Sequence, residues 1–130
     1  TYMWMKGLTT KPSERYFFAS FDYYHDENKI KSFEEIFAKI KKSEELKKLI
    51  IKFIILPYEY QTRDSCNRNY FLPQEKILKI LKNKNLKFLD LTKSFCDYKD
   101  VKKLYINFDP VHLSIKGHDL VYKHLNQFIN

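Results

Sequence analysis

The stretch that decides the fold class reads Leu49-Ile50-Ile51-Lys52-Phe53-Ile54-Ile55-Leu56-Pro57. Its apolar residues are continuous rather than alternating, Lys52 is the only interruption, and the isoleucines make it β-branched. Such a run is typical of a strand that is buried on both faces, and a proline can end it. We therefore predict a strand over 49–56 at the centre of a parallel sheet.

Upstream, an aromatic run and a helical pattern flank a polar segment. Tyr16 to Ser20 predicts a short buried strand that leads into a loop over 21–28. Apolar residues spaced as one helical face then predict a helix, in which Ser32 and Glu35 match the S-x-x-E capping pattern. That apolar face consists of Ile30, Phe33, Ile36, Phe37 and Ile40.

Downstream, the alternation of strand-like and helix-like segments continues. Pro73 can occupy the first turn of a second helix, and 86–91 predicts another strand. Leu104 to Ile106 predicts either a minor strand or a segment that packs under the site loop, and Ser114 can cap a last amphipathic helix. This order predicts a parallel sheet covered by helices, an α/β three-layer sandwich that forms a single domain over 1–130.

A second informative stretch reads Asp109-Pro110-Val111-His112-Leu113-Ser114-Ile115-Lys116-Gly117-His118. Acyl transfer needs an imidazole to take a proton from a nucleophile, and a carboxylate on the far ring nitrogen to fix the tautomer. An aspartate and a histidine three residues apart in a tight loop can supply that pair. The alternative is an exposed loop aspartate beside a histidine that caps the helix.

This block, followed by an amphipathic helix, resembles the final block of SGNH/GDSL hydrolases, where an aspartate and a histidine precede the last helix. The resemblance continues upstream, where Phe53 to Pro57 forms a strand that ends in proline. It implies a flavodoxin-like SGNH hydrolase fold, with Asp109 as orienting acid and His112 as general base. Gly117 and His118 match the small residue and polar neighbour that open the family's last helix, where we expect packing rather than catalysis.

Two parts of the family's pattern are missing from this sequence. No Gly-Asp-Ser block supplies a nucleophilic serine, and the segment 19–26 lacks the oxyanion-hole asparagine. We therefore expect the chain to be the C-terminal portion of a larger esterase or acyl hydrolase domain, without its N-terminal strand. The serine would come from residues upstream of Thr1, and this chain alone would be inactive. The alternative is a non-catalytic α/β binding or assembly module that kept the fold but lost the nucleophile.

The segment Tyr58-Glu59-Tyr60-Gln61-Thr62-Arg63 follows the central strand, at the end where open sheets bind ligands. We predict substrate contacts there, because tyrosine rings stack on sugars or acyl groups and an arginine can hold a carboxylate or a phosphate. The predicted contacts are Tyr58, Tyr60 and Arg63, and the substrate would be a small-molecule, glycan or lipid ester. The alternative for Arg63 is a surface ion pair with Glu59 or Asp64.

Charge and composition argue against other classes. The formal net charge is +8, but it is carried mostly by lysines on helix faces, which favours a solvated coat over nucleic-acid binding. His118 and His124 are six residues apart, so one helix cannot present both to a zinc ion, and no cofactor or metal is implied. The longest apolar run is well below the roughly 20 residues of a transmembrane helix, so we expect no transmembrane segment.

The two cysteines, Cys66 and Cys96, lack the paired spacing of a zinc ribbon. We expect free thiols, although the two could form one disulfide in an exported protein. The compartment, cytoplasmic or exported, and the oligomeric state are left open.

Overall fold

The structure is a computed structural model that describes residues 12–63, 66, 68–109 and 111–129, without the side chains of Pro12, Ser13 and Arg68. Two parts of the sequence predictions lie outside the described residues. These are Pro110 of the acid-base block and Asp64, one alternative partner of Arg63.

Two short strands, β1 (Lys52–Ile55) and β2 (Lys87–Asp90), pair in parallel from Lys52 opposite Lys87 to Ile55 opposite Asp90. The α-helices are α2 (Pro12–Phe21), α3 (Glu27–Lys47), α4 (Glu59–Arg63), α5 (Leu72–Asn83), α6 (Thr92–Cys96) and α7 (Ile115–Ile129). Three 3-10 helices complete the described chain, η1 (Asp22–His25), η2 (Arg68–Tyr70) and η3 (Val101–Leu104). No helix among the described residues is both long and apolar enough to cross a membrane.

The predicted three-layer α/β sandwich with a mainly parallel, flavodoxin-like sheet is wrong. The described chain is mainly helical, and its sheet has only two strands. The predicted strand at 16–20 lies inside α2, where the rings of Phe17 and Phe21, one helical turn apart, are 5.1 Å from each other. Leu104 to Ile106 yields only one antiparallel bridge, between Tyr105 and Leu113.

The predicted helix over 30–40 is confirmed by the longer α3, but its predicted cap is wrong. Asp26 precedes the helix, and its Oδ1 accepts hydrogen bonds from the backbone N–H groups of Asn28 (2.9 Å) and Lys29 (3.4 Å). Ser32 lies inside the helix and donates to the Asn28 carbonyl. An aspartate can satisfy the unpaired N–H groups of a first helical turn as well as a serine can.

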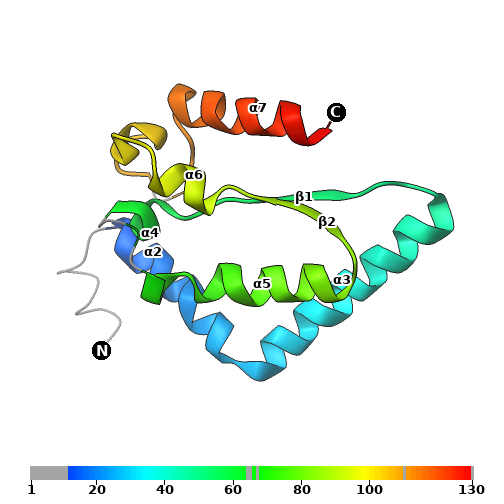
Figure 1. Cartoon of the computed structure of the whole chain (residues 1–130). Helices are drawn as coiled ribbons and strands as arrows, with labels where there is room; N and C mark the ends of the chain where they lie inside the picture. Colours follow the sequence, from blue (N-terminus) through cyan, green and yellow to red (C-terminus); the bar gives the residue numbers. More distant parts are fainter. Residues whose placement is uncertain (1–11, 64–65, 67, 110, 130) are drawn as a thin grey trace.

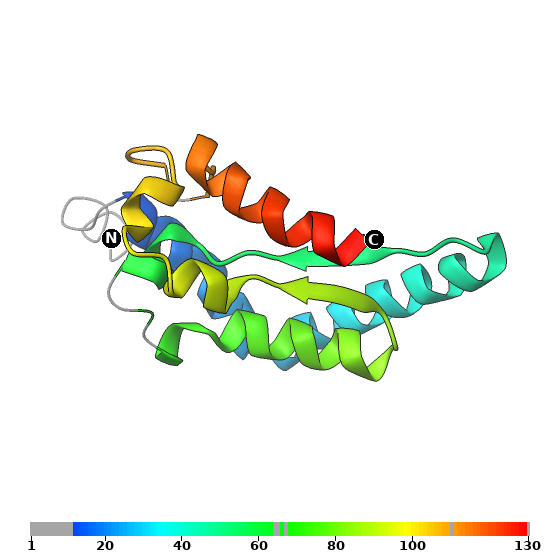
Figure 2. The same ribbon diagram turned by 45° about the horizontal axis from the view of Figure 1, so that its top comes forward.

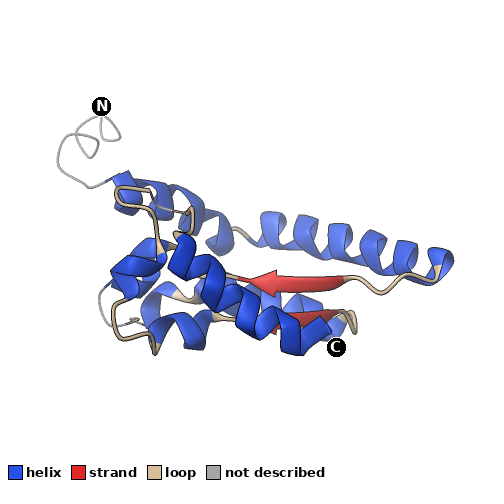
Figure 3. Ribbon diagram, turned by 90° about the horizontal axis from the view of Figure 1, so that it is seen from above, coloured by secondary structure: helices blue, strands red, loops and turns tan. Residues whose placement is uncertain are grey.

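Helices flank the strand pair on both sides. Figures 1 and 2 show α7 on one side and α3 with α5 on the other, and Figure 3 shows α7 crossing over the strands. Successive side chains of a strand point to opposite faces, and β1 follows this rule. Lys52 Nζ donates to the carbonyls of Phe128 (2.9 Å) and Ile129 (3.2 Å) in α7, whereas the Phe53 ring lies 5.3 Å from that of Phe37 in α3.

Two clusters of apolar and aromatic side chains lie beyond the carboxyl ends of the strands. One contains Leu91, Phe95, Leu104 and Tyr105, against which α7 packs Leu120 and Val121. The Tyr105 hydroxyl donates to the Pro57 carbonyl (2.9 Å), and burial raises the pKa of this phenol. The other is centred on the fully buried Phe17, whose ring contacts those of Phe18, Phe21, Tyr58, Tyr60 and Tyr70.

Candidate active site

The segment 106–113, called here the dyad loop, is closed at its base by backbone hydrogen bonds. The Ile106 N–H donates to the His112 carbonyl (3.0 Å), beside the bridge between Tyr105 and Leu113. A turn inside the loop is closed by the Asp109 N–H, which donates to the Ile106 carbonyl (3.0 Å). The loop therefore holds Asp109 and His112 on one short, doubly closed segment.

The Asp109 carboxylate organises this loop. Its Oδ1 accepts from the backbone N–H groups of His112 (2.8 Å) and Val111 (3.0 Å), and its Oδ2 lies 2.8 Å from His112 Nδ1. The two backbone hydrogen bonds, followed by the imidazole, lower the pKa of Asp109 to about 2. Asp109 is therefore a carboxylate at any pH at which an enzyme would ordinarily work.

The His112 side chain is 72% exposed, although Asp109 holds one of its nitrogens. A hydrogen bond to a carboxylate at Nδ1 favours the tautomer that carries the proton there, which leaves the Nε2 lone pair as the proton acceptor. The structure thus brings together the predicted acid and base at hydrogen-bonding distance. The pair can take up a proton at a solvent-facing nitrogen.

Helix α7 anchors the loop at its C-terminal side. Ser114 Oγ accepts from the Gly117 N–H (3.3 Å), as the sequence predicted for a cap, and also donates to the Lys103 carbonyl. A Cβ at Gly117 would lie 2.1 Å from the Leu104 carbonyl oxygen, so only glycine allows this close approach. The expected packing role of Gly117 is confirmed, and it fixes the helix that directly follows His112.

A nucleophile for this base is not found among the described residues. The hydroxyls of Ser20 and Ser32 donate to carbonyls of their own helices, and that of Ser114 donates to Lys103. The only hydrogen-bond partner of the His112 ring in the described part of the chain is Asp109. The Asp109–His112 pair therefore leaves the second ring nitrogen of His112 open to solvent.

The side chains predicted to contact substrate interact with other residues of the protein. The rings of Tyr58 and Tyr60 lie 5.9 Å and 5.2 Å from the buried Phe17 ring. Arg63 forms a bidentate ion pair with Glu59, in which Nε donates to Oε1 (2.9 Å) and Nη2 donates to Oε2 (2.5 Å). This pair is the alternative that the sequence left open for Arg63, and a role of these residues in substrate binding stays a prediction.

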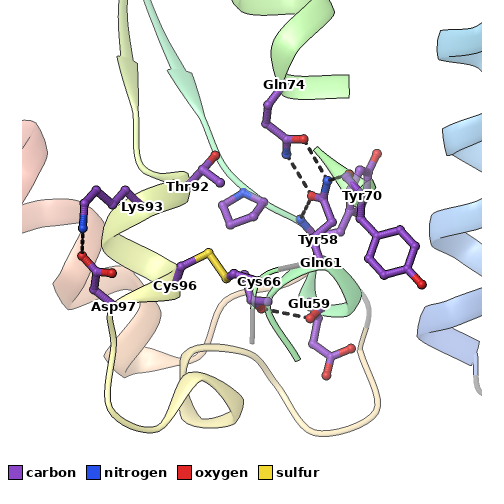
Figure 4. Close-up of a disulfide and its surroundings, with 12 residues drawn as sticks. Tyr58, Glu59, Gln61, Cys66, Tyr70, Gln74, Thr92, Lys93, Cys96 and Asp97 are labelled. Carbon is purple, nitrogen blue, oxygen red and sulfur yellow. Dashed lines mark hydrogen bonds and ion pairs between the residues drawn. A yellow bond between two sulfur atoms is a disulfide. The ribbon is translucent and has the colours of Figure 1, made fainter. Parts of the chain in front are cut away.

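Figure 4 shows that Cys66 and Cys96 form a disulfide, with Cα atoms 5.6 Å apart. The sequence favoured free thiols over metal ligands and left one disulfide open, and the structure contains that disulfide. Cys96 ends α6, whereas Cys66 lies in the connection from β1 to α5. The bond thus ties together the segments that follow the two strands.

Buried amides reinforce the same region and were not predicted. Gln61 and Gln74, nearly inaccessible to solvent, exchange side-chain hydrogen bonds of 2.8 Å and 2.9 Å (Figure 4). Gln61 also accepts from the Tyr58 N–H (2.7 Å) and donates to the Tyr70 carbonyl (2.5 Å). Glutamine is usually exposed, so nothing in the sequence pattern marked this pair as buried.

A hollow of about 720 Å³ lies against the dyad loop and was also missed. Its lining includes Lys102, Lys103 and Lys116, together with Ile106 and Ile115. The only sequence feature that marks this basic surface is the Lys102-Lys103 dipeptide before Leu104. Among the described residues, no group of three or more His, Cys, Asp and Glu side chains is arranged to hold a metal ion.

No protein-family model, no curated protein and no solved structure matches the chain in the comparisons with known proteins.

Proposed function

We propose that Asp109 and His112 are the orienting acid and the general base of an ester hydrolase or acyl-transfer site of the SGNH/GDSL kind. The nucleophilic serine would be supplied from outside the described residues. The substrate would be a small-molecule, glycan or lipid ester. The observation that carries the proposal is the 2.8 Å contact between His112 Nδ1 and Asp109 Oδ2. The rest of the His112 side chain is exposed to solvent.

In this mechanism, His112 Nε2 takes the proton of the serine hydroxyl as the serine oxygen attacks the ester carbonyl. The tetrahedral intermediate then expels the alcohol, which takes the proton from the imidazolium, and an acyl-enzyme remains. Water repeats the sequence, losing its proton to Nε2, and the regenerated serine takes that proton back. Asp109 keeps its negative charge throughout and stabilises the imidazolium in each step.

The electrostatics of the loop support this role. A carboxylate whose pKa is about 2 remains charged at neutral pH, as an orienting acid must. Its second oxygen is held by the backbone N–H groups of Val111 and His112, so the carboxylate does not need to rotate when the ring gains a proton. The site is thus preorganised for a cation on His112.

The test is ester hydrolysis by the complete gene product that contains this chain, with p-nitrophenyl butyrate as substrate. We expect His112→Ala to lower kcat/KM by roughly a million-fold if a serine is the nucleophile, and Asp109→Asn by about ten-thousandfold. His124→Ala, in α7 and outside the loop, is the control and should leave the rate unchanged. Hydrolysis that survives His112→Ala within tenfold would exclude the proposal.

No serine among the described residues is hydrogen-bonded to the exposed His112 ring, which also favours a second candidate, a non-catalytic binding or assembly module that has lost the nucleophile. A fluorophosphonate probe, which reacts with activated serines, separates the two. Labelling of the complete protein that disappears with His112→Ala supports the hydrolase. Absence of both labelling and turnover in the folded protein supports the binding module.

A further inference from the structure

The walls of the hollow beside the dyad loop combine basic and aliphatic side chains. Three lysines and a single aspartate supply the charge, and aliphatic side chains lie between them. An adjoining hollow of about 610 Å³ shares Lys103 and Lys116 and adds Lys99. Positive charge therefore extends along the surface from η3 to the start of α7.

Most of this positive charge is not neutralised within the described chain. Lys103 forms an ion pair with Asp100 at 2.6 Å, and this pair lowers the pKa of the Asp100 carboxyl. Asp100 is the only acidic residue among the described residues that line the hollow. Lys102, Lys116 and Lys99 have no ion-pair partner among the described residues. These lysines are available to an anionic surface.

Large apolar side chains project from the same surface. Phe108 is 96% exposed and Ile115 is 82% exposed, beside the half-exposed Ile106. Phe108 has a φ of 65°, a left-handed conformation that aromatic residues rarely adopt. The turn from Ile106 to Asp109 therefore holds this ring out in solvent, away from the two buried clusters.

We propose that these residues form a docking surface for an anionic lipid bilayer. The basic-apolar surface consists of Lys102, Lys103, Ile106, Phe108, Ile115 and Lys116. Exposed aromatic and aliphatic tips can enter the boundary between headgroups and acyl chains, while lysines beside them meet anionic headgroups. A small anion would use the lysines but would leave Phe108 and Ile115 in water.

The inference concerns attachment and does not depend on the proposed chemistry, because its test measures binding and no turnover. Should both hold, docking would place the dyad loop at the bilayer surface, where a lipid ester is presented. Loss of vesicle binding would leave the ester hydrolysis test unaffected, so the two proposals can fail separately.

The experiment is flotation of the protein with vesicles of phosphatidylcholine, with and without phosphatidylglycerol. We expect binding to the mixed vesicles only, and weaker binding at high salt. Phe108→Asn, which tolerates the left-handed backbone, should lower the partition coefficient roughly tenfold or more. Replacement of Lys102 and Lys116 by alanine should lower the partition coefficient about 25-fold, which is about fivefold for each lysine.

The connection from α3 to β1 offers a matched control at the opposite end of the strand pair (Figure 1). Leu46 and Ile50 are exposed there beside Lys47 and Lys48. The Leu46→Ser variant and the Lys47→Ala/Lys48→Ala variant should bind vesicles within twofold of the unchanged protein.

Three results would overturn the inference. The first is absence of binding to the mixed vesicles by the folded protein. The second is an equal loss in the control variants, which would indicate general attraction of a basic protein. The third is displacement by millimolar inorganic phosphate at constant ionic strength, which would identify a site for the free anion instead.

Discussion

The connection from β1 to α5 (residues 56–71) and the dyad loop differ in what holds them in place. The first is held by a disulfide, by buried amides and by aromatic rings around Phe17. The second depends on one carboxylate and on backbone hydrogen bonds at its base, and its histidine faces solvent. The strongest restraints thus lie in the connection from β1 to α5, and we expect substitutions of Asp109 or His112 to leave the fold intact.

The disulfide should provide the largest single effect on stability. Closing the separation of 30 residues between Cys66 and Cys96 restricts the unfolded chain, and a loop of this size corresponds to about 3.6 kcal/mol. We expect reduction to lower the free energy of unfolding by about that amount, measured by urea denaturation with and without reductant. A variant with both cysteines replaced by serine should not respond to reductant, and a response there would point to another target.

Removal of the Gln61 side chain should have the next largest effect. Gln61→Ala leaves the Tyr58 N–H, the Tyr70 carbonyl and the Gln74 amide without their partner in a buried site, which costs about 2 to 3 kcal/mol. Urea denaturation measures this loss. Gln127→Ala, exposed on α7, should change the unfolding free energy by less than about 0.5 kcal/mol. Equal effects would mean that the amide network contributes nothing.

Gly117→Ala should destabilise the protein by about 2 kcal/mol, because its Cβ would overlap the Leu104 carbonyl oxygen. Helix propensity alone would predict the opposite, a stabilised protein, because alanine favours helices more than glycine does. Thermal unfolding gives the magnitude, and the NMR shifts of the His112 ring report whether the loop moves with α7. A stabilised variant would show that the close approach does not occur in solution.

Acid should have the smallest and most local effect. The pKa of Asp109 is lowered, so the hydrogen bonds to its carboxylate are fully present above the unfolded value, near 3.9, and are lost as the pH falls through about 2. The Asp109 carboxyl carbon and the amides of Val111 and His112 should titrate together in NMR spectra. Asp109→Asn should abolish that transition, and a midpoint near 4 would contradict the lowered pKa.

The sequence predicted local features better than it predicted the fold class. The continuous apolar run marked the position of β1, but the strand covers 52–55 instead of 49–56, and Ile54 is exposed instead of buried. The cap at Ser114 and the contact between Asp109 and His112 follow from short-range chemistry. The run at Tyr16 to Ser20 was misread as a strand, because a short apolar run has the same pattern in a buried strand and in a helix. The number of strands, the buried amides and the cysteine pairing depend on contacts between distant segments, which periodicity does not encode.

The contact of Lys52 with the last turn of α7 has a consequence for folding kinetics. Its Nζ bonds to carbonyls 76 and 77 residues along the chain, whereas most helical contacts are local. A long-range contact of this kind forms only after the chain has lost the conformational entropy needed to bring its two ends together, and this slows folding. Helices and the local hydrogen bonds of the dyad loop should therefore form early in refolding, and α7 should dock onto β1 late.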